Sequence, residues 1–74
     1  MLRGTLPDIV TDTQIHLLKN VSILHATYQV RLLAFLAQKR EKQLVIHLPS
    51  TSTIGATLQA LMTKFPGLIA IERS

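Results

Sequence analysis

The sequence predicts a small α/β protein with a mostly parallel sheet, in the order strand, helix, strand, helix, strand. Three observations support this fold class. A compact, β-branched run at residues 43–48 is closed by Pro49, an apolar stripe with helical spacing follows it, and Pro66-Gly67 separates that stripe from a second apolar run at residues 68–71. Strand, helix and strand in close succession form a βαβ unit, so its two strands are expected to be parallel.

Length and composition indicate a single domain. The chain has 74 residues, of which 47% are hydrophobic and 16% charged, and it contains no cysteine. We expect residues 1–12 to form an irregular or edge segment and residues 13–74 to form the α/β core. A chain of this size buries only about 60% of the surface that its unfolded form exposes, and disulfides cannot compensate here. We therefore expect a protein partner or self-association to complete the core.

The first part of the core is predicted to be extended and then helical. Gln14 to Leu18 and Val21 to Leu24 are short, partly β-branched runs, separated by a turn-forming pair, Lys19-Asn20. From Thr27 onward the spacing is helical, with one apolar stripe formed by Tyr28, Leu32, Phe35 and Leu36.

The alternative for this part is one long N-terminal helix followed by the βαβ unit. Residues 11–14, Thr-Asp-Thr-Gln, fit a capping box. Apolar residues then recur at helical intervals, at Leu17, Val21, Leu24, Tyr28 and Phe35. Because periodicity does not decide the structure of short apolar runs, both arrangements stay open.

The second half of the chain carries the βαβ unit. The near-continuous apolarity of residues 43–48 is typical of a parallel strand covered on both faces, which predicts three layers. The two open sheet edges are then expected to pair with another subunit or to be covered by the N-terminal segment. The hydroxyl run Ser50, Thr51, Ser52 and Thr53 offers N-caps for a helix whose apolar stripe is Ile54, Leu58, Leu61 and Phe65.

The charge balance is basic, with a net charge of +4, and only Lys39, Arg40 and Lys42 form a cluster. They follow the first predicted helix, where cations interact favourably with the last carbonyl groups. The alternative is a basic contact patch for nucleic acid. Aromatic residues are too few for a base-stacking platform, and no nucleic-acid-binding motif is present, so the structural role is the main expectation.

Candidate chemistry is sparse. His16, His25 and His47 show no helical pair spacing and have no ligand-forming carboxylate within a few residues, so we expect no metal site and no cofactor. No arrangement of nucleophile, base and acid suggests an enzyme. Ser50 to Thr53 lie between a strand and a helix N-terminus, where an anion can bind, although the glycine-rich phosphate motifs are absent. Thr27 is a helix N-cap or, alternatively, a phosphorylation site.

The order of elements from Gln14 to Ile71 resembles the core of STAS domains, the family of anti-anti-sigma factors and related regulatory modules. The similarity includes Asn20 to Leu24, the residues His25-Ala26-Thr27-Tyr28, the apolar helix after them and the strand Gln43 to Leu48. In that family a hydroxyl residue at the start of this helix is phosphorylated, and Thr27 occupies its place. His25 and Tyr28 stand where the family has aspartate and glycine. The resemblance implies a regulatory protein-interaction domain.

A second resemblance, over about half of the chain, is to small β-grasp sulfur carriers of the molybdopterin-synthase type. It includes Val30 to Phe35, Leu44 to Pro49 and Phe65-Pro66-Gly67-Leu68, and it implies a strand at residues 30–36. Those carriers end in Gly-Gly, whereas this sequence ends Ile71-Glu72-Arg73-Ser74, so carrier chemistry is not expected.

The sequence therefore predicts a non-enzymatic interaction module, regulatory or structural, that docks an apolar sheet edge or helix face onto itself or a protein partner. A basic nucleic-acid-binding regulator is the alternative. No apolar stretch approaches the ~20 residues that a bilayer requires, and no signal-peptide pattern is present, so a cytoplasmic protein is expected.

Overall fold

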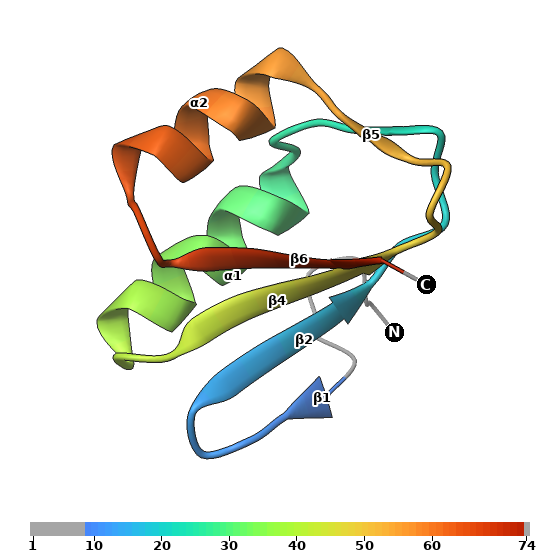
Figure 1. The fold of residues 1–74 in the computed structure, drawn as a ribbon. Coiled ribbons are helices and arrows are strands. Elements are labelled where there is room, and N and C mark those ends of the chain that lie inside the picture. The colour runs from blue at the N-terminus through green and yellow to red at the C-terminus, as the bar shows by residue number, and fades with distance from the viewer. Residues whose placement is uncertain (1–8, 74) are drawn as a thin grey trace.

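The computed structural model describes residues 9–73, which form six strands and two helices (Figure 1). In chain order the elements are β1 (Ile9–Val10), β2 (Gln14–Leu18), β3 (Ile23–Leu24), α1 (Tyr28–Lys39), β4 (Gln43–Leu48), β5 (Thr53–Ile54), α2 (Ala56–Lys64) and β6 (Ile69–Arg73). None of the helices described here is long and apolar enough to cross a membrane.

The main sheet has the order β1-β2-β4-β6. β2, β4 and β6 are mutually parallel, and the two-residue β1 lies antiparallel to β2 at one edge. β3 and β5 form a separate two-stranded parallel sheet. The predicted α/β class and the parallel βαβ unit at β4, α2 and β6 are confirmed. β3 lies within the extended run predicted at Val21 to Leu24 but belongs to the separate sheet, and β1 and β5 add strands to the predicted order. Residues 1–8 of the predicted N-terminal segment lie outside the described residues.

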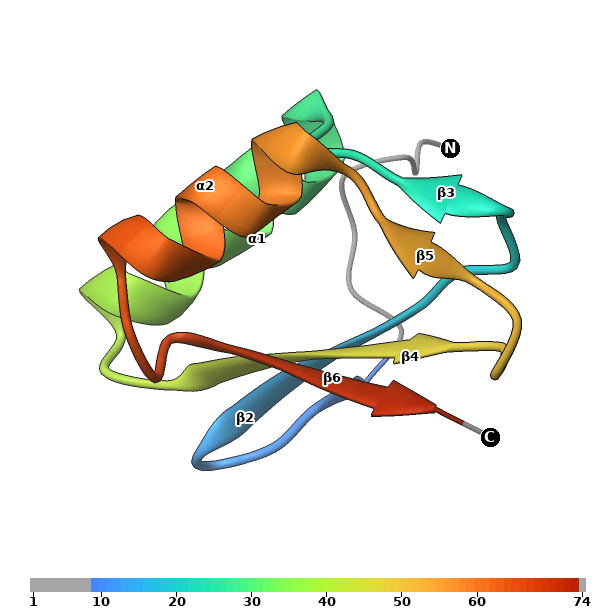
Figure 2. The same ribbon diagram turned by 45° about the horizontal axis from the view of Figure 1, so that its top comes forward.

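Both helices lie on the same face of the main sheet, so the prediction of three layers is wrong (Figure 2). The reason is visible along β4. Leu44, Ile46 and Leu48 join the core beneath the helices, while Gln43 and His47 are half-buried on the opposite face. Val45 is also buried but lies outside the core cluster. One extra apolar residue makes a strand with alternating faces look continuously apolar.

Residues 14–36 contain strands followed by a helix, so the alternative of one long helix is wrong. The strand at residues 30–36 that the sulfur-carrier resemblance implies is also wrong, because these residues belong to α1. The side chains that α1 buries are Val30, Leu33, Ala34 and Ala37. The predicted stripe is therefore displaced around the helix, and Tyr28 and Phe35 are 67% and 56% exposed. Small and branched residues on the inner side let α1 lie close to the sheet.

The second helix begins later than the hydroxyl run predicts. Its N-cap is Gly55, which makes no side-chain capping bond, so the prediction of a cap within Ser50–Thr53 is wrong. Backbone pairing with β3 explains the difference. The amide of Thr53 donates to Ser22 O at 2.9 Å and the amide of Gly55 donates to Leu24 O at 2.8 Å, which keeps this segment extended.

The last turn of α1 ends in a Schellman motif. The amide of Lys42 donates to Ala37 O at 2.7 Å, and the amide of Glu41 donates to Gln38 O at 3.2 Å. The residue between the helix and β4 that must adopt a left-handed conformation is Glu41, with a φ of 57°. Glycine is the usual residue at this position because it lacks a Cβ.

We expect Glu41→Gly to stabilise the protein by about 1 kcal/mol, because it removes the left-handed strain and a carboxylate from the negative end of the helix dipole. The urea midpoint of unfolding measures this gain. Gly67, with a φ of 82° and no atom within 4 Å of an added Cβ, provides the opposite control. Gly67→Ala should lower the midpoint, and a lower midpoint for Glu41→Gly would contradict the assignment.

Candidate functional site

The hydroxyl run between β4 and α2 is mainly occupied in holding the backbone. Ser52 is 4% exposed and its hydroxyl donates to Val21 O, while the hydroxyl of Thr53 donates to Ser22 O at 3.3 Å. The guanidinium of Arg73 donates to Ser52 O. Ser50 and Thr51 are exposed. The loop therefore fastens β3 and the end of β6 to the turn before β5, and anion binding there stays a prediction.

Thr27 lies at the start of α1, as predicted. Its hydroxyl accepts a hydrogen bond from the amide of Val30 at 3.3 Å, and its backbone is extended, with φ −69° and ψ 171°. The residue is exposed, so this N-cap is open to solvent.

We expect Thr27→Ala to destabilise the protein by about 1 kcal/mol, since the Val30 amide loses its capping partner. Thr27→Ser keeps the hydroxyl and should restore most of the loss in urea unfolding. Equal loss in both variants would show that the threonine methyl group, not the cap, is responsible.

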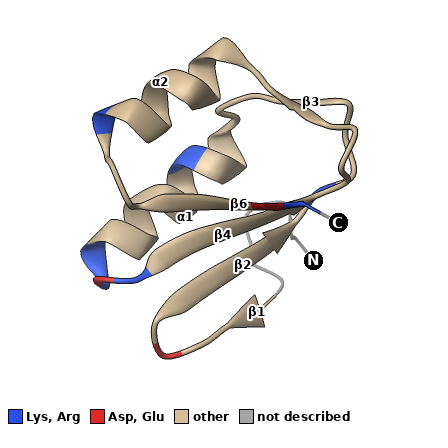
Figure 3. Ribbon diagram, viewed as in Figure 1, with Lys and Arg blue, Asp and Glu red and all other residues tan. Residues whose placement is uncertain are grey.

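The predicted basic cluster lies at the C-terminal end of α1. Lys39 places Nζ 5.8 Å from the centre of the Phe35 ring, and Lys42 donates from Nζ to Thr11 O at 2.7 Å. Arg40 is the C-cap of the helix. The fold adds two cations that sequence reasoning missed, Arg31 on α1 and Lys64 at the end of α2 (Figure 3). They were missed because they lie far from the cluster in sequence.

A groove runs between α1 and α2, formed by three hollows of about 610, 350 and 150 Å³ that share lining residues. Arg31 and Leu61 belong to both smaller hollows, and Gln38, Phe65 and Leu68 connect the smallest to the largest. We call this continuous depression the interhelical groove. It begins near Ala26 and Thr57, at the N-terminal ends of the helices, and opens at the amino ends of β2, β4 and β6.

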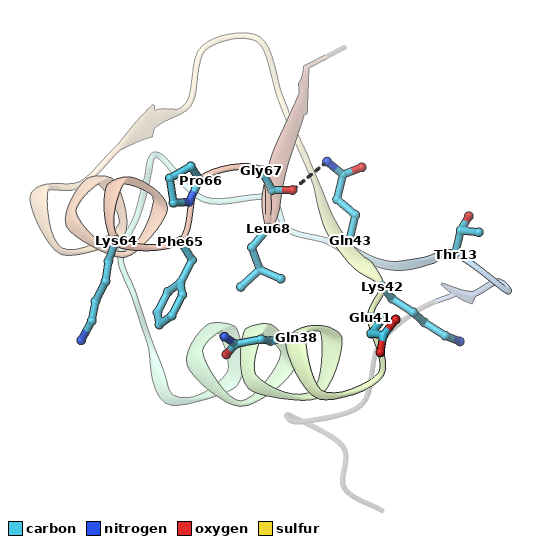
Figure 4. A pocket seen from close by; sticks show the side chains of 10 residues that line it. All are labelled: Thr13, Gln38, Glu41, Lys42, Gln43, Lys64, Phe65, Pro66, Gly67 and Leu68. Atoms are coloured by element: carbon cyan, nitrogen blue, oxygen red, sulfur yellow. Dashed lines mark hydrogen bonds between the residues drawn. The ribbon is translucent and has the colours of Figure 1, made fainter.

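The interhelical groove combines an apolar lining with cations at its borders. Its apolar side chains include Ala34, Phe35, Ala60, Leu61, Phe65 and Leu68. In Figure 4, Phe65 and Leu68 point toward α1, and Gln38 faces them from that helix. Lys64 and Lys42 lie at opposite ends of the hollow of about 610 Å³, and their side chains extend away from its centre. Such a site matches a ligand with an apolar stripe and negatively charged flanks.

The fold also brings together two histidines that the sequence analysis treated as separate. His16 Nδ1 lies 2.8 Å from His47 Nε2, and the two rings are inclined by 25°. We call these residues the histidine pair. They come from neighbouring parallel strands, on the face of the main sheet opposite to the helices, whereas His25 follows β3 elsewhere. Local spacing cannot reveal such a pair; only the register of β2 against β4 does.

A separate hollow of about 370 Å³ lies at the carboxyl ends of β2 and β4, the edge where parallel sheets commonly bind ligands. It is lined by Leu18, Lys19, Asn20, His47, Leu48 and Pro49. Lys19 donates from Nζ to Gln29 Oε1 at 2.8 Å. These residues include no pairing of a nucleophile with a base and an acid, so they do not suggest catalysis.

Comparisons with protein-family models, curated proteins and solved structures found no match to this chain. The interhelical groove and the histidine pair are therefore the features of this chain that point to a function.

Proposed function

We propose that this chain is a non-enzymatic, cytoplasmic interaction module whose interhelical groove binds an acidic, amphipathic helical segment of a protein partner. The continuous apolar groove with cations along its borders is the observation that carries this proposal. This groove identifies the helix surface that docks. Its lining and its cations also indicate the chemistry of the partner, which is apolar on one side and acidic on its flanks.

The apolar lining favours a partner that buries side chains. Leu61, Phe65 and Leu68 are half-buried in the free protein, and Phe35 is largely exposed, so an apolar stripe placed over them would remove further surface from water. Removal of apolar surface is favourable at roughly 25 cal/mol per Å². The aliphatic part of this lining, Ala34, Ala60, Leu61 and Leu68, favours the aliphatic side chains of a protein over the flat bases of a single-stranded nucleic acid, which stack on aromatic rings.

The charges favour an acidic partner. Arg31, Lys39, Arg40, Lys42 and Lys64 lie on the two helices or directly after α1. Among the described residues the acidic side chains are Asp12, Glu41 and Glu72, and only Glu41 lies beside the groove. Opposite charges across an interface raise the association rate and disfavour wrong partners.

The length of the interhelical groove suits a partner helix of about three turns. α1 has 12 residues, which corresponds to about 18 Å along its axis. A partner helix of the same length presents apolar residues at positions i, i+4, i+7 and i+11, which spreads four apolar side chains along the three hollows of the groove. The groove therefore matches a short helical segment more closely than an extended strand.

A labelled three-turn peptide tests the proposal, with leucine at those four positions and glutamate on the flanks. We expect saturable binding by fluorescence anisotropy, weakening as salt rises. The same peptide with lysine in place of glutamate should bind at least tenfold more weakly. Equal binding of both peptides, or tighter binding of duplex or single-stranded DNA, would reject the proposal, as would a dimer in sedimentation that excludes the peptide.

A further inference from the structure

The histidine pair belongs to a polar ladder on the sheet face opposite the helices. Along this ladder His16 Nε2 lies 3.1 Å from Gln14 Oε1, Gln14 Nε2 donates to Gln43 Oε1 at 3.5 Å, and Gln43 Nε2 donates to Gly67 O at 3.3 Å. Val45, beneath the ladder, is buried. The ladder holds the two imidazole rings in place over an apolar base.

The carbonyl oxygen of Gly67, at the end of the ladder, determines which atom donates the proton in each of the other hydrogen bonds. Gly67 O only accepts, so Gln43 and then Gln14 present amide groups as donors toward it and oxygens toward the next partner. The oxygen of Gln14 therefore accepts from His16 Nε2–H. Neutral His16 then has an unprotonated Nδ1, which accepts from His47 Nε2–H across the 2.8 Å contact.

This arrangement resembles the support that proteins give to metal-binding histidines. A ligating imidazole usually donates its other N–H to a carbonyl or carboxylate oxygen, which fixes both ring orientation and tautomer. Gln14 Oε1 does this for His16 and leaves Nδ1 with its lone pair toward His47. Two nitrogens that each lie about 2.0–2.1 Å from one metal ion are separated by roughly 3 Å, close to the separation found here.

We propose that His16 and His47 chelate a divalent late transition-metal ion through Nδ1 of His16 and Nε2 of His47. The ion takes the place of the hydrogen bond and lies to one side of the line between the two nitrogens, because each metal–nitrogen bond is about 2.0–2.1 Å long. The proton of His47 Nε2 leaves to solvent and Nδ1 of the same ring takes one up, so two metal–nitrogen bonds replace one hydrogen bond with no net proton release. Imidazole nitrogen binds Cu²⁺ most tightly of the first-row divalent ions.

Water completes the coordination of the ion. Among residues 9–73, no three histidine, cysteine, aspartate or glutamate side chains converge on one point, so the protein supplies two ligands. Glu72 lies directly opposite His47 in the register of β4 and β6, on the same face of the sheet. Its carboxylate adds negative charge beside the ion, and it is exposed. The site is therefore open, as sites that exchange water or bind a further ligand are.

Titration of the intact protein with Cu²⁺ alone, followed by calorimetry and visible absorption, tests this site. One equivalent should bind, and saturating Cu²⁺ should raise the thermal midpoint, because the ion binds the folded ladder. In NMR spectra of the unchanged protein, Cu²⁺ should broaden the ring signals of His16 and His47 before those of His25. This measurement does not depend on the folding of any variant.

Variants identify the ligands. His16→Gln and His47→Gln should each lower the Cu²⁺ affinity at least tenfold, and Glu72→Gln should lower it less. His25→Gln is the matched control, because it also removes one imidazole, and its affinity should be unchanged. Uniform broadening of all three histidines, unchanged affinity of the His16→Gln/His47→Gln double variant, or no Cu²⁺-dependent shift of the midpoint would overturn the proposal.

Discussion

Leu58→Ala is expected to leave most of the protein unfolded at room temperature. Leu58 is fully buried, and it is the buried residue of α2, so it fastens that helix to the core formed by α1 and the sheet. A buried Leu→Ala change costs about 2–5 kcal/mol, and a domain of this size has a total stability of roughly 3–5 kcal/mol. Far-ultraviolet circular dichroism and urea unfolding measure the loss.

Leu18→Ala is the matched control for that change. Leu18 is 55% exposed at the end of β2, so the same substitution should alter stability by about 0.5 kcal/mol or less. If Leu58→Ala were as stable as Leu18→Ala, α2 would not be held by its buried face, and the interhelical groove would have no fixed wall.

The double variant Arg31→Glu/Lys64→Glu is expected to lower affinity for the acidic helical peptide by roughly tenfold to a hundredfold. Both residues are exposed at the borders of the groove, so the change should leave the fold intact. Each reversal replaces an attraction with a repulsion, and two such changes together amount to about 1–3 kcal/mol. Fluorescence anisotropy at low and at moderate salt measures the effect, which should shrink as salt rises.

Two controls separate local charge from net charge. Lys64→Glu and Lys19→Glu make the same change of charge, but Lys19 lies at the carboxyl end of β2, away from the groove, so only the first should weaken binding. The lysine version of the peptide should bind the double variant better than it binds the original protein. Equal effects at Lys64 and Lys19 would mean that the peptide senses only the overall charge.

Local patterns predicted one strand and two helix ends well. The strand at residues 43–48 has the predicted bounds, Thr27 caps the first helix, and the second helix ends before Pro66-Gly67. Each of these features depends on neighbours in sequence: a β-branched run closed by proline, a hydroxyl at a helix start, and a residue pair that interrupts a helix. The α/β class follows from the same patterns.

Features that depend on pairing between distant segments were not predicted. The sequence of Thr53 and Ile54 is typical of a helix start, but these residues pair with β3 as a strand. Arg31 and Lys64 lie at the border of one groove only because the two helices lie side by side. His16 and His47 become a pair only through the register of β2 and β4. In each case the structure depends on a contact with a strand or helix that is distant in sequence. The conformational preference of the neighbouring residues is either weaker than that contact or unrelated to it.

The short β3–β5 sheet joins the segments that lead into the two helices at one end of the interhelical groove only, so the two ends of the groove differ, and unequal ends give a bound segment a direction. At the N-terminal ends of the helices, the β3–β5 ladder and a bond from the Ala26 amide to Thr57 Oγ1 at 3.0 Å link the segments that lead into α1 and α2. The hollow of about 610 Å³ lies at the opposite end, beside Phe65 and Leu68. A partner helix with its bulkiest apolar residue at one terminus would therefore enter in one orientation, so reversing the order of its residues should abolish the fit while preserving composition and charge.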